Sequence, residues 1–232
     1  MGDELGAHPG SLMISLNGEW MDNDIYKKHM KGTTTVGIIC SDGVVVGADS
    51  RATMDTFIAS TEARKVWKID STVAMTIAGS VGDAQELIRM IKAQNEIYKM
   101  NENHPMSPKS AASLLSIVMQ QNKMIPFMVQ LIIAGVDSGK PQLYSMDPIG
   151  GYNEESKFTA TGSGSITALG YLEEIYKDGV STKEAIRMAA RAITIAMRRD
   201  SATGNNMTIA TVTKSGYTEY SAKEIERIVS AK

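Results

Sequence analysis

Lys31-Gly-Thr-Thr-Thr-Val-Gly37 marks the point at which the chain changes character. Residues 1–31 have no sustained hydrophobic period of 2 or 3.6 residues, whereas strand-like, β-branched runs begin at Thr33. Three consecutive threonines favour a β-strand, and on these residues alone the start of a strand is the preferred interpretation. The stretch also places a hydroxyl directly after a glycine, which allows a second interpretation.

Cleavage of the Gly32–Thr33 bond would give Thr33 a free α-amine beside its own Oγ. An α-amine has a pKa of about 7.7 to 8.0, which suits a general base at neutral pH. Threonine paired with an N-terminal amine is an established type of activated nucleophile. One residue could therefore supply both the nucleophile and the base.

Composition limits the kinds of partner that the chain can have. It has 232 residues, of which 43% are hydrophobic and 22% charged, as expected of a soluble globular protein. Its net charge of -2 gives no electrostatic reason to expect nucleic acid or a membrane surface as a partner. The single cysteine, Cys40, suits a reducing compartment, and no secretory signal or membrane-spanning run is present. We expect a cytoplasmic protein.

Histidine is scarce, which narrows the possible chemistry. His8 and His29 lie in the leader, so only His104 could serve a Ser-His-Asp or Cys-His arrangement. A zinc site with several histidines is impossible beyond residue 32. The Gly-Ser-Gly at 162–164 lacks the glycine spacing and the trailing lysine of a phosphate-binding P-loop. We therefore expect a hydrolase that works without histidine, metal or cofactor.

The order of expected elements predicts an α+β fold. Strands and helices come in segregated blocks, which favours packed sheets with helices outside over alternating βαβ units. We expect one domain over residues 33–232, preceded at 1–32 by a leader that is either a removable pro-segment or a disordered terminus. The expected strands are 34–40, 44–48, 65–69, 72–77, 129–136, 142–146, 158–161, 207–213 and 217–220, and the expected helices 80–100, 107–123, 165–176, 181–199 and 224–229.

A threonine nucleophile needs a nearby cation, carboxylates that position this cation, and donors for an oxyanion. Asp49, Arg51 and Lys65 are candidates at strand ends, although each alone is more readily a solvated charge beside a turn. Gly79 precedes a helix, so its N–H could face an oxyanion or simply permit a tight turn.

A second polar cluster follows the helix expected at 181–199. Helix capping explains the two arginines and the glycine of Arg198-Arg-Asp-Ser-Ala-Thr-Gly204. It leaves Asp200, Ser201 and Thr203 without an explanation.

These features together resemble the β-subunits of archaeal-type proteasomes, which are N-terminal-nucleophile hydrolases. The resemblance runs from Thr33 to the C-terminus. Each matching segment is weak alone, but seven in the right order are specific. They are 32–37 (GTTTVG), 47–51 (GADSR), 63–66 (ARKV), 76–79 (TIAG) with 82–84 (GDA), 128–131 (MVQL), 161–164 (TGSG) and 199–202 (RDSA).

The resemblance implies a role for each candidate on the nucleophile's side of the site. Thr33 would be the nucleophile and, through its amine, the base. Lys65 would lower the pKa of that amine, and Asp49 would hold Lys65. The N–H of Gly79 would bind the oxyanion.

It also implies that three further side chains complete the network around the amine. These are Ser163, Asp200 and the hydroxyl at position 203. The family usually has serine where this chain has Thr203, so the hydroxyl is kept but a methyl is added.

By the same alignment, a pocket would receive the substrate side chain that precedes the scissile bond. No charge lies among its four residues, so we expect a preference for apolar or aromatic side chains. Small hydrophobic differences discriminate by only about 1 to 3 kcal/mol, so specificity should be broad. The four residues are Ala52, Ala63, Ile77 and Val81.

For the whole molecule the resemblance implies a four-layer αββα sandwich. Residues 1–32 would be a propeptide that the subunit removes autocatalytically, so that the precursor is a zymogen. Seven β-subunits would form a ring, stacked with rings of proteasome α-subunits. An ATPase cap would deliver unfolded polypeptides to the enclosed threonine peptidase.

Two alternatives remain open. The first is the bacterial two-ring peptidase related to proteasomes, which also begins with paired threonines. The Arg-Asp-Ser-Ala and Gly-Ser-Gly contexts favour the proteasome, and a requirement for a separate α-subunit would discriminate between the two. The second is a non-catalytic ring component, against which the presence of Thr33, Asp49 and Lys65 argues.

Overall fold

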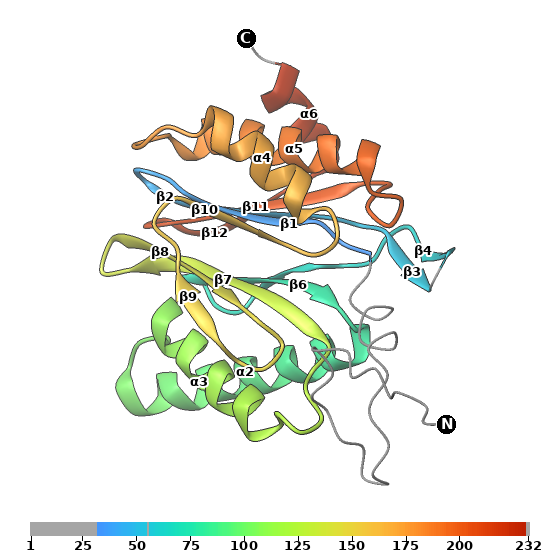
Figure 1. Cartoon of the computed structure of the whole chain (residues 1–232). Helices are drawn as coiled ribbons and strands as arrows, with labels where there is room; N and C mark the ends of the chain where they lie inside the picture. Colours follow the sequence, from blue (N-terminus) through green and yellow to red (C-terminus); the bar gives the residue numbers. More distant parts are fainter. Residues whose placement is uncertain (1–31, 55, 231–232) are drawn as a thin grey trace, which may run out of the picture.

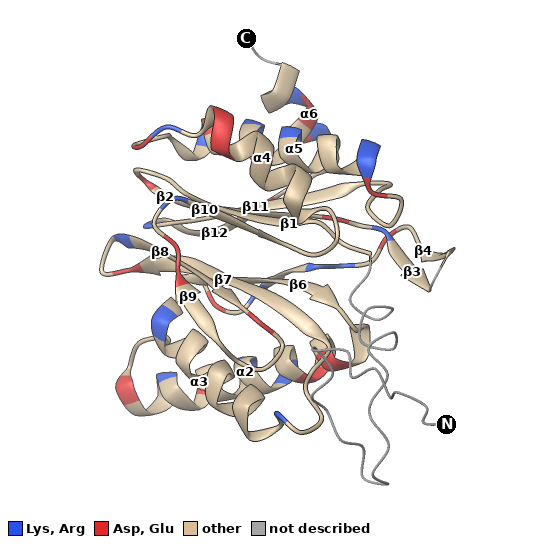
Figure 2. Cartoon of the chain, viewed as in Figure 1, with Lys and Arg blue, Asp and Glu red and all other residues tan. Residues whose placement is uncertain are grey.

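The computed structural model describes residues 32–54 and 56–230. Two five-stranded antiparallel sheets lie face to face, with α2 and α3 outside one sheet and α4, α5 and α6 outside the other (Figure 1). Both signs of charge are spread over helices and loops (Figure 2). The α+β class expected from the sequence is confirmed.

The first sheet has the strand order β10-β1-β2-β11-β12. Its centre is β2, which pairs with β1 on one side and β11 on the other. The strands are β1 (Thr35–Ile39), β2 (Gly43–Asp49), β10 (Phe158–Thr161), β11 (Met207–Thr213) and β12 (Gly216–Tyr220).

The second sheet has the order β5-β6-β7-β8-β9, and a separate two-stranded hairpin projects beyond both sheets (Figure 1). The sheet consists of β5 (Val66–Lys68), β6 (Val73–Gly79), β7 (Val129–Asp137), β8 (Lys140–Met146) and β9 (Tyr152–Glu154). The hairpin consists of β3 (Ala52–Met54) and β4 (Phe57–Ser60).

Side-chain caps define where the helices begin. Ser80 and Ser107 cap α2 and α3, and Ser181 and Glu184 form a capping box at the start of α5. The helices are α2 (Val81–Glu102), α3 (Pro108–Gln121), α4 (Ser165–Ile175), α5 (Thr182–Arg199) and α6 (Ala222–Ser230).

Three apolar layers separate the two sheets and the helices. Strand β2 contributes side chains to two of these layers, because successive residues point to opposite faces of the sheet. Val45 faces the helices, while Val44 and Val46 face the other sheet. Between the sheets the Leu143 side chain packs directly on Gly37 of β1, where a Cβ would lie 2.6 Å from Leu143 Cδ1. A larger residue at this position would therefore press against the facing sheet.

All the strands and helices expected from the sequence are present, with boundaries shifted by at most a few residues. Two features were missed, namely the β3–β4 hairpin and strand β9. Every residue of β4 and β9 is exposed, so neither strand carries the apolar alternation that predicts a strand. The expected leader lies outside the described residues, except for Gly32.

Candidate active site

The ends of four strands meet at one corner of the sheet pair. Thr33 lies just before β1, and Asp49 ends β2 beside it, because Thr35 pairs with Ala48. Lys65 lies just before β5, where its carbonyl accepts a hydrogen bond from the Ile77 N–H of β6. The pairing of β1 with β2 places Thr33 beside Asp49, and the packing of the second sheet against the first brings Lys65 to them.

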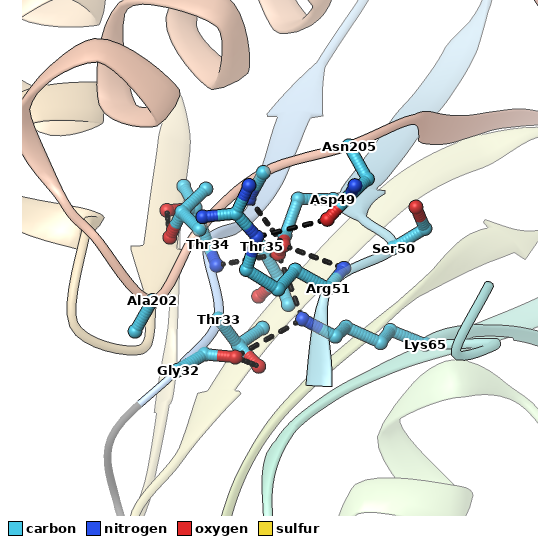
Figure 3. A network of polar contacts seen from close by, with 12 residues as sticks. Gly32, Thr33, Thr34, Thr35, Asp49, Ser50, Arg51, Lys65, Ala202 and Asn205 are labelled. Carbon is cyan, nitrogen blue, oxygen red and sulfur yellow. Dashed lines mark hydrogen bonds and ion pairs between the residues drawn. The ribbon is translucent and has the colours of Figure 1, made fainter. Parts of the chain in front are cut away.

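A buried ion pair occupies the centre of this corner (Figure 3). Lys65 Nζ lies 2.8 Å from Asp49 Oδ1, and their side chains are 8% and 0% exposed. The carboxylate also accepts backbone N–H bonds from Thr34 at 2.9 Å and from Arg51 and Gly204 at 3.0 Å each. With four donors around it, Asp49 holds the Lys65 ammonium in a fixed place.

Burial lowers the pKa of Lys65 below its ordinary value of 10.5, and the nearby Arg51 guanidinium adds to this effect. Asp49 opposes it through charge and a hydrogen bond, and Asp200 through charge. The ammonium also donates to the carbonyl oxygen of Gly32 at 3.1 Å. An ammonium whose lowered pKa makes it a stronger acid therefore contacts the peptide that precedes Thr33.

The Thr33 hydroxyl lies against the same peptide group. Its Oγ1 donates to the Gly32 carbonyl oxygen at 2.5 Å, and the residue is buried. Gly32 has a φ of +110°, and a Cβ there would lie 2.4 Å from Thr53 Oγ1. Both the backbone conformation and the available space require glycine before the threonine.

A cluster of hydroxyls around one carboxylate approaches from the opposite side. Ser163, in the turn between β10 and α4, accepts N–H bonds from Gly32 at 3.3 Å and Thr33 at 3.4 Å. Ser163 Oγ donates to Asp200 Oδ2 at 2.5 Å. Thr203 Oγ1 donates to the same oxygen at 2.6 Å, so the threonine at this position makes the carboxylate contact with its hydroxyl.

Arg51 fixes the loop that carries Asp200 and Thr203 (Figure 3). Its guanidinium donates to Asn205 Oδ1 at 2.8 Å and to the Ser201 carbonyl at 2.7 Å. The sequence suggested Arg51 as a possible cation for the nucleophile, and the structure instead directs its side chain to this loop. Neither Asn205 nor Thr34 was singled out from the sequence, because their contacts depend on how distant strands pair.

A cavity of about 290 Å³ opens beside Thr33. All four residues expected to form a substrate pocket line it, together with Thr33, Lys65 and Gly79. The four expected residues carry no charge, but the cavity is also lined by the charged residues Arg64 and Lys65. The charge of Arg64 is paired with Glu219 at 2.9 Å and stacked on the Trp67 ring at 5.0 Å. The other lining residues that sequence reasoning missed are Thr53, Trp67, Ala84, Gln85 and Ile88.

Gly79 ends β6 at the rim of this cavity. Its φ is +126°, and a Cβ there would lie 2.2 Å from the Met128 carbonyl oxygen, so only glycine fits. Among residues 32–54 and 56–230, no group of three His, Cys, Asp or Glu side chains could hold a metal ion. In the same described ranges no helix is long and apolar enough to cross a membrane.

Comparison with known proteins identifies the family to which this geometry belongs. The family model described as "Proteasome subunit" matches residues 29–212. The chain belongs to the proteasome subunit family. Its relatives include "Proteasome subunit beta" of Methanococcus vannielii, 51% identical over 89% of this chain and 95% of that protein. The same-named protein of Methanosarcina mazei is 47% identical over 89% of this chain and 97% of its own length. The resemblance to archaeal-type proteasome β-subunits is confirmed.

Proposed function

We propose that this chain is a threonine endopeptidase subunit of a self-compartmentalised proteasome core particle. One observation carries the proposal. The Thr33 hydroxyl and the Lys65 ammonium both contact the Gly32 carbonyl oxygen, at 2.5 and 3.1 Å. A nucleophile and a cation on one carbonyl are the requirements for cleaving the peptide bond that precedes the nucleophile.

In the first reaction, Thr33 Oγ attacks the Gly32 carbonyl carbon while Lys65 stabilises the charge that develops on the oxygen. Collapse of this intermediate breaks the Gly32–Thr33 C–N bond, leaves the Gly32 acyl group on Oγ as an ester, and passes the hydroxyl proton to the Thr33 nitrogen, which leaves as an amine. Water then hydrolyses the ester. The products are a leader that ends in the Gly32 carboxylate and a Thr33 with a free amine and a free hydroxyl.

In the mature subunit, the Thr33 amine takes the proton of its own Oγ, which attacks the substrate carbonyl. The nearby Lys65 ammonium keeps the amine neutral by repelling a second positive charge. Ser163, bonded to Asp200, orients the amine, and the Gly79 N–H binds the oxyanion. The acyl-enzyme ester is hydrolysed in turn, which regenerates Thr33.

We propose that the cavity lined by Ala52, Ala63, Ile77 and Val81 receives the side chain before the scissile bond. These four residues are apolar, and the two charges that also line the cavity, Arg64 and Lys65, are already paired with Glu219 and Asp49, so apolar and aromatic side chains are preferred. Because small hydrophobic differences discriminate weakly, the peptidase has broad specificity.

The relatives named proteasome subunit beta support a corresponding assembly. We propose that residues 33–232 form one N-terminal-nucleophile domain of the four-layer αββα type and that residues 1–32 are its propeptide. Heptameric β-rings stack with α-subunit rings in the cytoplasm, and an ATPase cap feeds in unfolded polypeptides. Degradation then takes place inside a closed chamber.

The test is the Thr33→Ala variant, co-expressed with its α-partner and compared with the wild-type protein by intact mass and peptide hydrolysis. We expect assembled rings that keep residues 1–32 and have no peptidase activity. Thr35→Ser is the matched control, because Thr35 uses its hydroxyl only on Thr161, at 2.7 Å, in the described structure. Normal turnover by Thr33→Ala would refute the mechanism, and a retained leader in wild-type rings would indicate a non-catalytic subunit.

A further inference from the structure

Thr34, the residue after the nucleophile, contacts both polar clusters of the site. It is completely buried. Its N–H donates to Asp49 Oδ1 at 2.9 Å, on the side of Lys65. Its hydroxyl lies 2.8 Å from Thr203 Oγ1, on the side of Asp200. Thr34 is thus the one residue described here that bonds to Asp49 with its backbone and to Thr203 with its side chain.

The hydrogen bonds of Thr203 fix the direction of the proton between the two threonines. A hydroxyl has one proton, and Thr203 donates its proton to Asp200 Oδ2 at 2.6 Å. Thr203 must therefore accept a hydrogen bond from the Thr34 hydroxyl. Thr34 thus donates to Thr203, and Thr203 donates to the Asp200 carboxylate. Ser163 donates to the same carboxylate oxygen, which leaves its own oxygen free to accept the N–H of Thr33.

The position of the Thr34 hydroxyl is also fixed by its surroundings. A Cβ at Gly164 would lie 2.0 Å from Thr34 Oγ1 and 3.2 Å from Thr203 Oγ1. The glycine therefore makes the space in which these two hydroxyls meet. Because Thr34 is adjacent to Thr33 in the chain, any shift of its side chain is transmitted directly to the nucleophile.

We propose that Thr34 is a positioning residue for peptide hydrolysis. Its hydroxyl holds Thr203 in the orientation that supports the Asp200 carboxylate, and through Asp200 and Ser163 it orients the amine of Thr33. This inference rests on the proposed function of Thr33. It also gives a reason for the second threonine of the run that strand formation alone does not provide.

The experiment compares Thr34→Val, which keeps the shape but removes the hydroxyl, with Thr34→Ser, which keeps the hydroxyl. Both are co-expressed with the α-partner, and kcat and KM for a fluorogenic peptide are measured against pH. Rates are referred to the amount of processed subunit found by intact mass. Thr33→Ala is included as the variant that tests the proposed function itself.

We expect Thr34→Val to lose about tenfold in kcat with little change in KM, the effect of one hydrogen bond. Thr34→Ser should restore kcat. Retention of the leader in Thr34→Val but not in Thr34→Ser would also support the proposal, since it would show the same dependence on the hydroxyl in the first cleavage.

A Thr34→Val profile that superimposes on the wild-type profile would overturn the inference, and so would a Thr34→Ser variant as impaired as Thr34→Val. If Thr34→Val rings do not assemble, Thr34→Ala is measured in the same way, and failure of both would make the role purely structural. Turnover by Thr33→Ala would instead refute the proposed function. An inactive Thr33→Ala beside a normal Thr34→Val would refute only the role of Thr34.

Discussion

At the scale of single residues, the proposed catalytic site depends most on the two contacts of the buried Lys65 ammonium. It pairs with Asp49 at 2.8 Å and reaches the Gly32 carbonyl at 3.1 Å. Removing one member of a buried pair leaves the other charge without compensation. The same substitution also removes the cation that would stabilise a developing oxyanion.

Lys65→Ala should therefore remove its leader about 10² to 10³-fold more slowly, the cost of removing one such donor, and its peptide hydrolysis should fall with the amount of processed Thr33. Intact mass and steady-state kinetics measure the two effects. Lys68→Ala is the matched control, because Lys68 is an exposed cation at the end of the same strand. Near wild-type rates for Lys65→Ala would show that the cation serves stability alone.

Cys40 gives a prediction for stability against pH. Burial raises the pKa of its thiol from 9.0 to about 12, and the charge of Asp42 adds to the effect. The thiol has a higher pKa in the folded protein than in the unfolded chain. The contribution of the neutral thiol to the free energy of unfolding is therefore complete below pH 9.0 and is lost as pH rises toward about 12. In that window the unfolded chain releases a proton that the native chain keeps.

The unfolding free energy of the wild-type protein should therefore fall more steeply above pH 9.0 than that of Cys40→Ala. Urea titrations at several alkaline pH values measure the difference between the two proteins. If the unfolding free energies of the two proteins fell in parallel with pH, the thiol would ionise as easily in the folded protein as in the unfolded chain.

At the scale of elements, the close contact between the two sheets depends on Gly37 in β1. A Cβ there would lie 2.6 Å from Leu143 Cδ1 and 3.0 Å from Ile132 Cγ2, both in the facing sheet. Gly170 in α4 is the opposite case, because a Cβ there would meet nothing within 4 Å. The same substitution should therefore have opposite effects at the two positions.

Gly37→Ala should lower the unfolding free energy by about 1 to 3 kcal/mol, as expected of an overpacked core. Gly170→Ala should raise it by about 1 kcal/mol, because alanine is the better helix former. Denaturant unfolding of the two variants beside the wild-type protein checks both signs. A stable Gly37→Ala would mean that the sheets separate at little cost.

The sequence predicted elements well where their pattern is local. Caps such as Ser107 and Ser181, and the β-branched run of β2 after the Asp42-Gly43 turn, identified helices and strands in advance. The β3–β4 hairpin was missed because its exposed strand, β4, has no core-facing pattern. Contacts such as Thr34 with Thr203 were beyond local reasoning, since they depend on the pairing of β11 with β2.

At the scale of the whole molecule, the candidate site is built from parts that are far apart in the chain. Thr33 precedes the first strand, Ser163 follows β10, and Asp200 follows α5. The order of residues in the sequence therefore identifies separate motifs but does not show that they form one site. The pairing of β10, β1, β2 and β11 in one sheet brings these side chains to one corner. This explains why a family resemblance suggested the candidate site when spacing alone did not.

This spread also sets a sequence of events during synthesis. On the ribosome, Thr33 emerges well before the loop at 200–204 that completes its surroundings. Strand β11 must then insert beside β2 before the Gly204 N–H reaches Asp49. Under the proposed mechanism, cleavage at Gly32–Thr33 therefore follows the insertion of β11, and the appearance of processed subunit would report that the fold is complete.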